Sequence, residues 1–145
     1  MSRAGRTILV VDDSPSVRLY HTVALGLQGH TCLAAADGAA GLALLRDRPV
    51  DLILLDLCME GMGGAEFVDR VRALGGRAIP VILISSSDEV DMRAVARGGP
   101  GVMVLGKPVP PPVLVAAVDR LLGASDRPPS AGPGAASRPT AQPPA

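Results

Sequence analysis

Three acidic residues stand out in this chain because each one lies where a run of apolar residues ends. They are Asp12, Asp13 and Asp56. Carboxylates that converge repel one another and raise at least one pKa, unless a divalent cation lies among them. Magnesium prefers oxygen ligands and keeps several waters, so one or two carboxylates and a backbone carbonyl suffice to hold it. The three acids therefore predict a magnesium site.

Two further residues have the chemistry of a phosphate site. Ser85 ends an apolar run, and Lys107 follows another; Lys107 is also the only lysine among fourteen basic residues. A hydroxyl donor and a compact ammonium suit the oxygens of a phosphoryl group. Taken singly, an exposed loop lysine or an acid that caps a helix is the ordinary interpretation. The joint placement of all five residues favours a site that binds magnesium and phosphate.

The elements that must position these residues alternate regularly along the chain. Short apolar runs predict strands over residues 7–13, 31–36, 51–56, 80–85 and 102–106. Helical stretches follow at residues 14–28, 38–47, 64–74, 88–97 and 110–122, the first with Ser14 as N-cap and Pro15 at the first helical position. Such alternation predicts an α/β fold with a parallel sheet covered by helices on both faces. Ligands bind such sheets at the carboxyl ends of the strands, where all five residues fall.

Composition limits the other possibilities. The chain has 145 residues, a formal net charge of zero and a pI of about 6.7, so no basic field points to nucleic acid or to an anionic membrane as a partner. No apolar run approaches the roughly 20 residues that span a bilayer, and a cytoplasmic location is expected. Cys32 and Cys58 lack CxxC spacing and are expected to be free thiols.

The C-terminal part of the sequence differs sharply from the rest. Residues 123–145 contain no Leu, Ile, Val or aromatic residue and are dominated by Pro, Ala, Gly and Ser. Such a segment buries too little apolar surface to offset the entropy of ordering. We therefore expect one folded domain over residues 1–122 and a disordered Pro/Ala-rich tail or linker over residues 123–145.

Four segments carry a resemblance to a known family: VVDDSPSVR at 10–18, LILLDLCMEGMGG at 52–64, PVILISSS at 80–87 and GKPVPPPVL at 106–114. In this order they resemble the response-regulator receiver domains of two-component signalling, including the single-domain chemotaxis type. The resemblance implies a flavodoxin-like fold of five parallel strands in the order 2-1-3-4-5, with five helices. It also implies a cis bond before Pro108, a turn proline.

The same resemblance implies a role for each residue of the site. Asp56 would accept the phosphoryl group, with Ser85 and Lys107 in contact with its oxygens. The residues that would bind magnesium are Asp12, Asp13, Asp56 and, through its backbone carbonyl, Cys58. The donor would be a sensor histidine kinase or a phosphotransfer protein, and the output would be contact with a downstream protein. The chain would then be a switch that phosphorylates and dephosphorylates itself, rather than a turnover enzyme.

Two alternatives remain open in the sequence. Receivers commonly have an aromatic switch residue on the last strand, where this chain has Val104, so a receiver-like interaction module that works without phosphorylation is one alternative. If phosphorylation does act, we expect it to act mainly through residues 86–91 and through the backbone at 98–101, rather than through a side-chain rotation at Val104. The other alternative is a nucleotide-binding loop, because residues 101–108 match GxxxxGK, although Pro108 replaces the required Ser or Thr.

Overall fold

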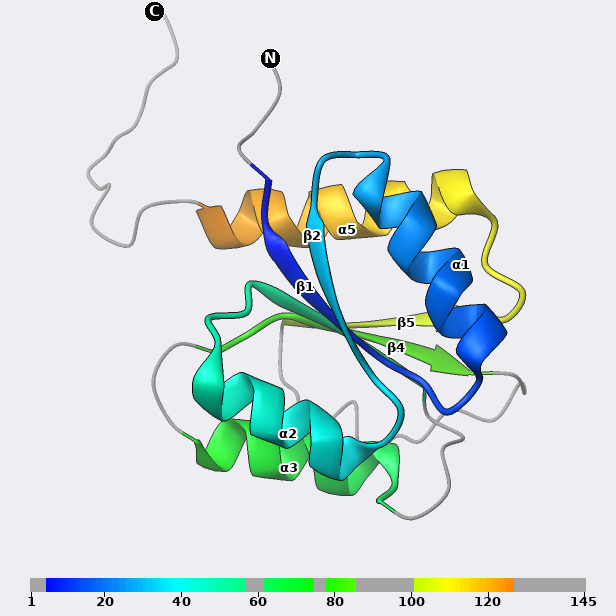
Figure 1. The fold of residues 1–145 in the computed structure, drawn as a ribbon. Coiled ribbons are helices and arrows are strands. Elements are labelled where there is room, and N and C mark those ends of the chain that lie inside the picture. The colour runs from blue at the N-terminus through cyan, green and yellow to red at the C-terminus, as the bar shows by residue number, and fades with distance from the viewer. Residues whose placement is uncertain (1–4, 57–61, 75–77, 86–100, 127–145) are drawn as a thin grey trace, which may run out of the picture.

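The fold is built on a five-stranded parallel sheet (Figure 1). The structure is a computed structural model, and it describes residues 5–56, 62–74, 78–85 and 101–126. The strands are β1 (Thr7–Val11), β2 (Thr31–Ala35), β3 (Leu52–Asp56), β4 (Val81–Ser85) and β5 (Val102–Gly106). Their order is β2-β1-β3-β4-β5, which confirms the predicted 2-1-3-4-5 arrangement. The order reverses next to β1, so the carboxyl ends of β1 and β3 flank the point where such sheets bind ligands.

Four helices lie in the described residues and cover both faces of the sheet. They are α1 (Pro15–Gly26), α2 (Gly38–Asp47), α3 (Gly64–Ala73) and α5 (Pro111–Asp126). Figure 1 shows α1 and α5 on one face and α2 and α3 on the other. The helix predicted over 88–97 lies outside the described residues. The last helix continues to Asp126, past the end at residue 122 that the sequence pattern predicts.

Helix α1 begins and ends as its sequence predicts. The Ser14 hydroxyl accepts a hydrogen bond from the backbone N–H of Val17, and Pro15 occupies the first turn, where its missing N–H costs nothing. The helix ends at Gly26, and the backbone then turns at Gly29, whose φ of 93° favours glycine. This turn leads directly into β2. The cap at Ser14 therefore fixes where α1 starts relative to the two acids that precede it.

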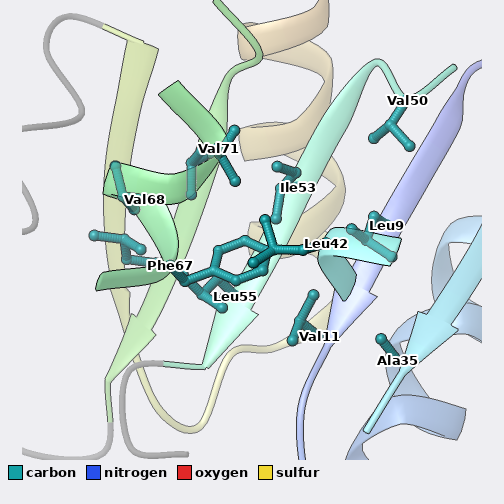
Figure 2. Packing of buried hydrophobic residues seen from close by; sticks show 12 residues of the cluster. Leu9, Val11, Ala35, Leu42, Val50, Ile53, Leu55, Phe67, Val68 and Val71 are labelled. Carbon is teal, nitrogen blue, oxygen red and sulfur yellow. The ribbon is translucent and has the colours of Figure 1, made fainter. Parts of the chain in front are cut away.

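Strands β3 and β4 are buried over their whole length, because helices cover both faces. Alternate side chains consequently contribute to two separate cores. Under α1 and α5 the core includes Ile8, Leu54 and Leu114. Under α2 and α3 a second core contains Leu9, Val11, Ala35, Leu42, Val50, Ile53, Leu55, Phe67, Val68, Val71, Val81 and Leu83, most of which are labelled in Figure 2.

Phe67 is the aromatic centre of the second core and is completely buried. In Figure 2 its ring lies between the side chains of Leu42 and Leu55. Gly41 of α2 lies close to this ring and to Val11, since a Cβ at position 41 would be only 3.2 Å from Phe67 Cε1 and 3.1 Å from Val11 Cγ2. A glycine at this position therefore lets α2 approach β1 and α3 closely.

No helix among the described residues is both long enough and apolar enough to cross a membrane. Cys32 is a free, half-buried thiol whose sulfur lies 3.9 Å from the carbonyl oxygen of Thr22. Burial raises the pKa of this thiol above its ordinary value of 9.0. The other cysteine, Cys58, lies outside the described residues.

Candidate functional site

The five polar residues predicted from the sequence all lie at the carboxyl edge of the sheet. Asp56 and Ser85 are the last residues of β3 and β4. Asp12 and Asp13 directly follow β1, and Lys107 directly follows β5. The parallel register pairs Asp56 with Ile84 and Ser85 with Gly106, so neighbouring strands end at nearly the same level. This common level is what gathers residues from four strands at one place.

The three carboxylates form a compact acidic cluster. Oxygens of Asp12, Asp13 and Asp56 lie within 4.8 Å of one another, a separation that suits shared coordination of a metal ion. Asp12 and Asp56 are only 3% and 4% exposed, whereas Asp13 is exposed. The pKa of Asp12 is raised above 3.8, first by burial and then by the nearby Asp56 and Asp13 charges, although the Ser14 N–H and Lys107 oppose the rise. A bound cation would relieve this repulsion.

Two contacts hold Asp12 in place. Its Oδ1 accepts a hydrogen bond of 2.9 Å from the backbone N–H of Ser14, at the start of α1. Its backbone carbonyl accepts a bond of 2.6 Å from Nη1 of Arg18, one turn further along the helix. Helix α1 therefore fixes both the side chain and the main chain of this acid. Arg18 was not predicted as a site residue, because no local sequence pattern indicates its bond to the backbone carbonyl of Asp12.

Lys107 places an ammonium beside the acidic cluster. Its Nζ lies 3.3 Å from Oδ1 of Asp56, and its side chain is 28% exposed. Its backbone N–H donates a 2.7 Å bond to the carbonyl of Ser85, which continues the β4–β5 pairing by one residue. The Lys107–Pro108 peptide bond is cis, as predicted. The main chain thus directs the ammonium toward Asp56.

Two neighbouring residues of α1 lie beside Lys107 and were not predicted from the sequence. The hydroxyl of Tyr20 donates a 3.1 Å hydrogen bond to the carbonyl oxygen of Val109, and so connects α1 to the segment that follows Lys107. His21 is 4% exposed, and burial, followed by the Lys107 charge, lowers its pKa below 6.5. The helical spacing of His21 from Leu25 signals burial, because residues four apart share one face.

Some predictions made from the sequence concern residues that the structure does not describe, and one prediction is wrong. The backbone carbonyl of Cys58 and residues 86–91 are among those the structure does not describe. Val104 is partly buried and packs against the core under α2 and α3. The nucleotide-binding interpretation is wrong, because Val102–Gly106 is a strand paired with β4 and cannot also be a phosphate-binding loop.

Comparison with known proteins gives a consistent family assignment. The family model for the response regulator receiver domain matches residues 8–119. The chain is 31% identical over 116 residues to protein PilH of Pseudomonas aeruginosa, and the match covers 79% of this chain and 96% of PilH. It is 33% identical over 122 residues to the transcriptional regulatory protein AfsQ1 of Streptomyces coelicolor, with 83% of this chain and 53% of AfsQ1 covered.

Solved structures agree with these relatives. The chemotaxis protein CheY4 of Vibrio cholerae superimposes with a TM-score of 0.74 at 28% identity, and covers 81% of this chain and 99% of its own. The chain spans about half the length of AfsQ1 and of the DNA-binding response regulator MtrA of Mycolicibacterium smegmatis. The similarity therefore extends over whole single-domain proteins and over one part of larger regulators.

Proposed function

Because this chain belongs to the response regulator receiver family, we propose that Asp56 is its phosphoacceptor and that its donor is the phosphohistidine of a kinase or phosphotransfer protein. The observation that carries the proposal is the 3.3 Å distance between Lys107 Nζ and Asp56 Oδ1. An almost fully buried carboxylate with one ammonium beside it is a nucleophile whose charge is compensated. Nothing in the described residues favours the phosphorylation-independent alternative.

The proposed reaction is a phosphoryl transfer between two side chains. A carboxylate oxygen of Asp56 forms a bond to phosphorus while the bond from phosphorus to the donor's histidine nitrogen breaks, which leaves an acyl phosphate on Asp56. Lys107 and the Ser85 hydroxyl hold the oxygens of the transferring group. Since such transfer requires mainly positioning and charge stabilisation, residues fixed by the ends of β3, β4 and β5 are sufficient for it.

The acidic cluster suits a magnesium ion in this proposal. Its oxygens are the ligand type that magnesium prefers. The pKa of Asp12 is raised first by burial and in smaller part by the charges of Asp56 and Asp13, and a cation would offset that repulsion between carboxylates. Asp12, Asp13 and Asp56 would hold the ion, together with the backbone carbonyl of Cys58. When bound, magnesium neutralises negative charge on the phosphoryl oxygens.

The proposed output is a reversible switch rather than substrate turnover. Water hydrolyses the acyl phosphate, which regenerates the Asp56 carboxylate and releases inorganic phosphate. Each cycle leaves the chain ready for another transfer, and the inorganic phosphate is released when the switch is reset. The proposal places this cycle in the cytoplasm, with a downstream protein as the reader of the phosphorylated state.

The exposed apolar face of α1 supports docking of the phosphodonor. Leu19, Val23 and Leu27 are exposed large apolar residues on this helix. With Pro111 they line a shallow groove of about 440 Å³ between α1 and the start of α5. This groove lies next to the segment that carries Lys107, so a donor helix seated there would bring its histidine near Asp56. We assign the groove to the histidine-bearing helix of the donor.

Intact-mass analysis tests the central claim. With magnesium and an excess of a small phosphodonor such as acetyl phosphate, the wild type should gain the mass of one phosphoryl group. Asp56→Ala should gain none. Asp119→Asn, a substitution of an exposed acid on α5, is the matched control and should gain one group. An unmodified wild type, or a modified Asp56→Ala, would refute the assignment.

A further inference from the structure

Arg18 contacts one of the two acids that follow β1, and it has no part in the proposed phosphoryl transfer. It is the only arginine of α1, and it is half-buried. Its Nη1 donates a 2.6 Å hydrogen bond to the carbonyl oxygen of Asp12. Within the described part of the chain it pairs with no carboxylate, so its charge is directed at the main chain. Charge-assisted hydrogen bonds of this kind are short and strong.

The peptide group that Arg18 binds is the one that joins Asp12 to Asp13. A peptide group is planar, so a bond to its carbonyl oxygen limits rotation about the backbone bonds on either side of it. Two other bonds hold Asp12, because its N–H donates to the Ala35 carbonyl at 3.1 Å and its Oδ1 accepts from the Ser14 N–H at 2.9 Å. Those bonds restrain the preceding peptide group and the side chain of Asp12. Arg18 restrains the following peptide group, which leads to Asp13.

Asp13 depends on its backbone for its position. It is exposed, the chain bends at this residue, and no hydrogen bond or ion pair with another described residue holds its carboxylate. One of its carboxylate oxygens nevertheless lies within 4.8 Å of oxygens of Asp12 and Asp56. Where side-chain contacts do not fix a metal ligand, the main chain must do so. The orientation of the peptide group before Asp13 therefore decides whether this acid can share a cation with the other two.

We propose that Arg18 is a positioning residue for the magnesium site, and that it acts by holding the main chain that directs Asp13 into the acidic cluster. This role rests on the proposed function, which supplies the magnesium site. Residues that hold metal ligands in place typically account for roughly 10- to 100-fold in metal affinity. The charge of Arg18 has the opposite effect, because a cation near the cluster repels Mg²⁺. Removal of Arg18 therefore weakens magnesium binding through lost positioning, whereas an effect of charge alone would strengthen it.

Magnesium titration of the full chain, followed by the amide NMR signals of Asp12, Asp13 and Asp56, measures this affinity without phosphorylation. Arg18→Met keeps an apolar stem of good helix propensity but removes the donor and the charge, and should raise the magnesium dissociation constant about tenfold. Arg18→Lys keeps the charge and one donor, and should stay within about threefold of the wild type. An unchanged or lower dissociation constant in Arg18→Met would overturn the proposal.

Arg70→Met is the matched control, because it also removes an arginine and one positive charge from a helix. Arg70 is an exposed residue of α3, where its Nη2 pairs with Oε2 of Glu66 at 2.8 Å, and it lies outside the acidic cluster. This variant should bind magnesium as the wild type does. A loss of affinity as large as that in Arg18→Met would reveal a general effect on the protein and would overturn the proposal.

A double-mutant cycle with Asp13 tests the route of the effect. Asp13→Ala removes the carboxylate and should itself weaken magnesium binding, while Asp12 and Asp56 remain as ligands. Because Arg18 acts through Asp13, adding Arg18→Met to Asp13→Ala should raise the dissociation constant further by less than about twofold. Losses that simply multiply in the double variant would refute the route through Asp13.

Two results separate the role of Arg18 from the proposed function. If magnesium shifts none of the three amide signals in the wild type, the role of Arg18 is refuted, and intact mass with acetyl phosphate still tests Asp56 as the phosphoacceptor. If Asp56 gains no phosphoryl group although Arg18→Met weakens magnesium binding about tenfold, the proposed function fails and the role of Arg18 stands.

Discussion

At the scale of single residues, Asp12 is suited to the proposed metal site but lowers the stability of the metal-free protein. It is nearly fully buried, and its burial and two neighbouring acids raise its pKa. A carboxyl whose pKa is higher in the folded state binds its proton more tightly there than in the unfolded chain. In the absence of metal, the free energy of unfolding therefore falls as the pH rises from about 3.8 through the folded pKa. The charge that the proposed metal site would use therefore destabilises the metal-free fold.

Asp12→Asn should consequently stabilise the metal-free protein at neutral pH. The amide oxygen can still accept the bond from the Ser14 N–H, so the geometry at the start of α1 is preserved. Urea unfolding as a function of pH should show a gain at pH 7 that disappears below pH 4. Magnesium should raise the melting temperature of the wild type by mass action and that of the variant less.

The matched control is Asp37→Asn, which changes an exposed acid that caps α2 and lies outside the cluster. It should leave the magnesium response as it is in the wild type. A magnesium response that Asp12→Asn does not reduce would place the cation elsewhere.

At the scale of elements, helix α2 can pack close to the sheet because residue 41 is a glycine and has no side chain. Gly41→Ala adds a methyl group against Val11 and Phe67, and both of these side chains are buried in the core. The cost of overpacking should exceed the gain of about 1 kcal/mol in helix propensity, so we expect a net destabilisation of about 1 kcal/mol. Chemical denaturation measures it.

Gly26→Ala is the matched substitution in α1. A Cβ at this position meets no atom within 4 Å, and its φ is not positive. We expect a stabilisation of about 0.4 to 1 kcal/mol, because the unfolded chain loses freedom. The two alanines should thus act in opposite directions. If Gly41→Ala stabilised the protein as much as Gly26→Ala, the tight packing of α2 would be disproved.

The hydrogen bond from Tyr20 to Val109 connects α1 to the segment that positions Lys107. Tyr20→Phe should cost about 0.5 to 1.5 kcal/mol of stability, as expected for one hydrogen bond. It should also slow phosphorylation by acetyl phosphate, since the segment after β5 loses one of its attachments. Thr22→Ala, which removes an exposed hydroxyl of the same helix that bonds within α1, is the control and should not slow it.

Tyr20 also provides its own readout. The chain has one tyrosine and no tryptophan, so its tyrosine fluorescence arises from Tyr20 alone. If the segment after Lys107 moves on phosphorylation, this emission should change in the wild type and stay constant in Asp56→Ala. Constant emission in a phosphorylated wild type would show that α1 is not linked to the switch.

For the molecule as a whole, the sequence predicts the architecture well because burial determines the pattern. Runs such as LILL before Asp56 are apolar on both faces, and only a parallel sheet between two helix layers buries them fully. The sequence also predicts that the five polar residues lie close together, since parallel strands have their carboxyl ends at one edge of the sheet. Their family roles came from the resemblance and stay predictions until phosphorylation is measured.

The features that could not be predicted from the sequence depend on contacts between residues that are far apart along the chain. Tyr20 and Val109 are far apart in the sequence, and no local pattern connects a helix tyrosine to that carbonyl. His21 fits the apolar face of a helix, but only the packed structure shows that its Nδ1 is buried with no hydrogen-bond partner in the part of the chain that is described. The sequence pattern also predicts too early an end for the last helix, because residues 123–126 are Gly, Ala, Ser and Asp and contain no large apolar side chain that would mark a further helical turn.

Lys107 has one more consequence, for chemical modification of the protein. Because it is the only lysine, amine-reactive reagents and acetylation enzymes have one side-chain target in this chain, and that target pairs with Asp56. Acetylation at this single position would remove the cation from the proposed phosphorylation site. Brief treatment with acetic anhydride, followed by peptide mass analysis, should label Lys107 faster in Asp56→Ala than in the wild type. Coupling the protein to a sensor surface through lysine would for the same reason remove the cation from the proposed phosphorylation site.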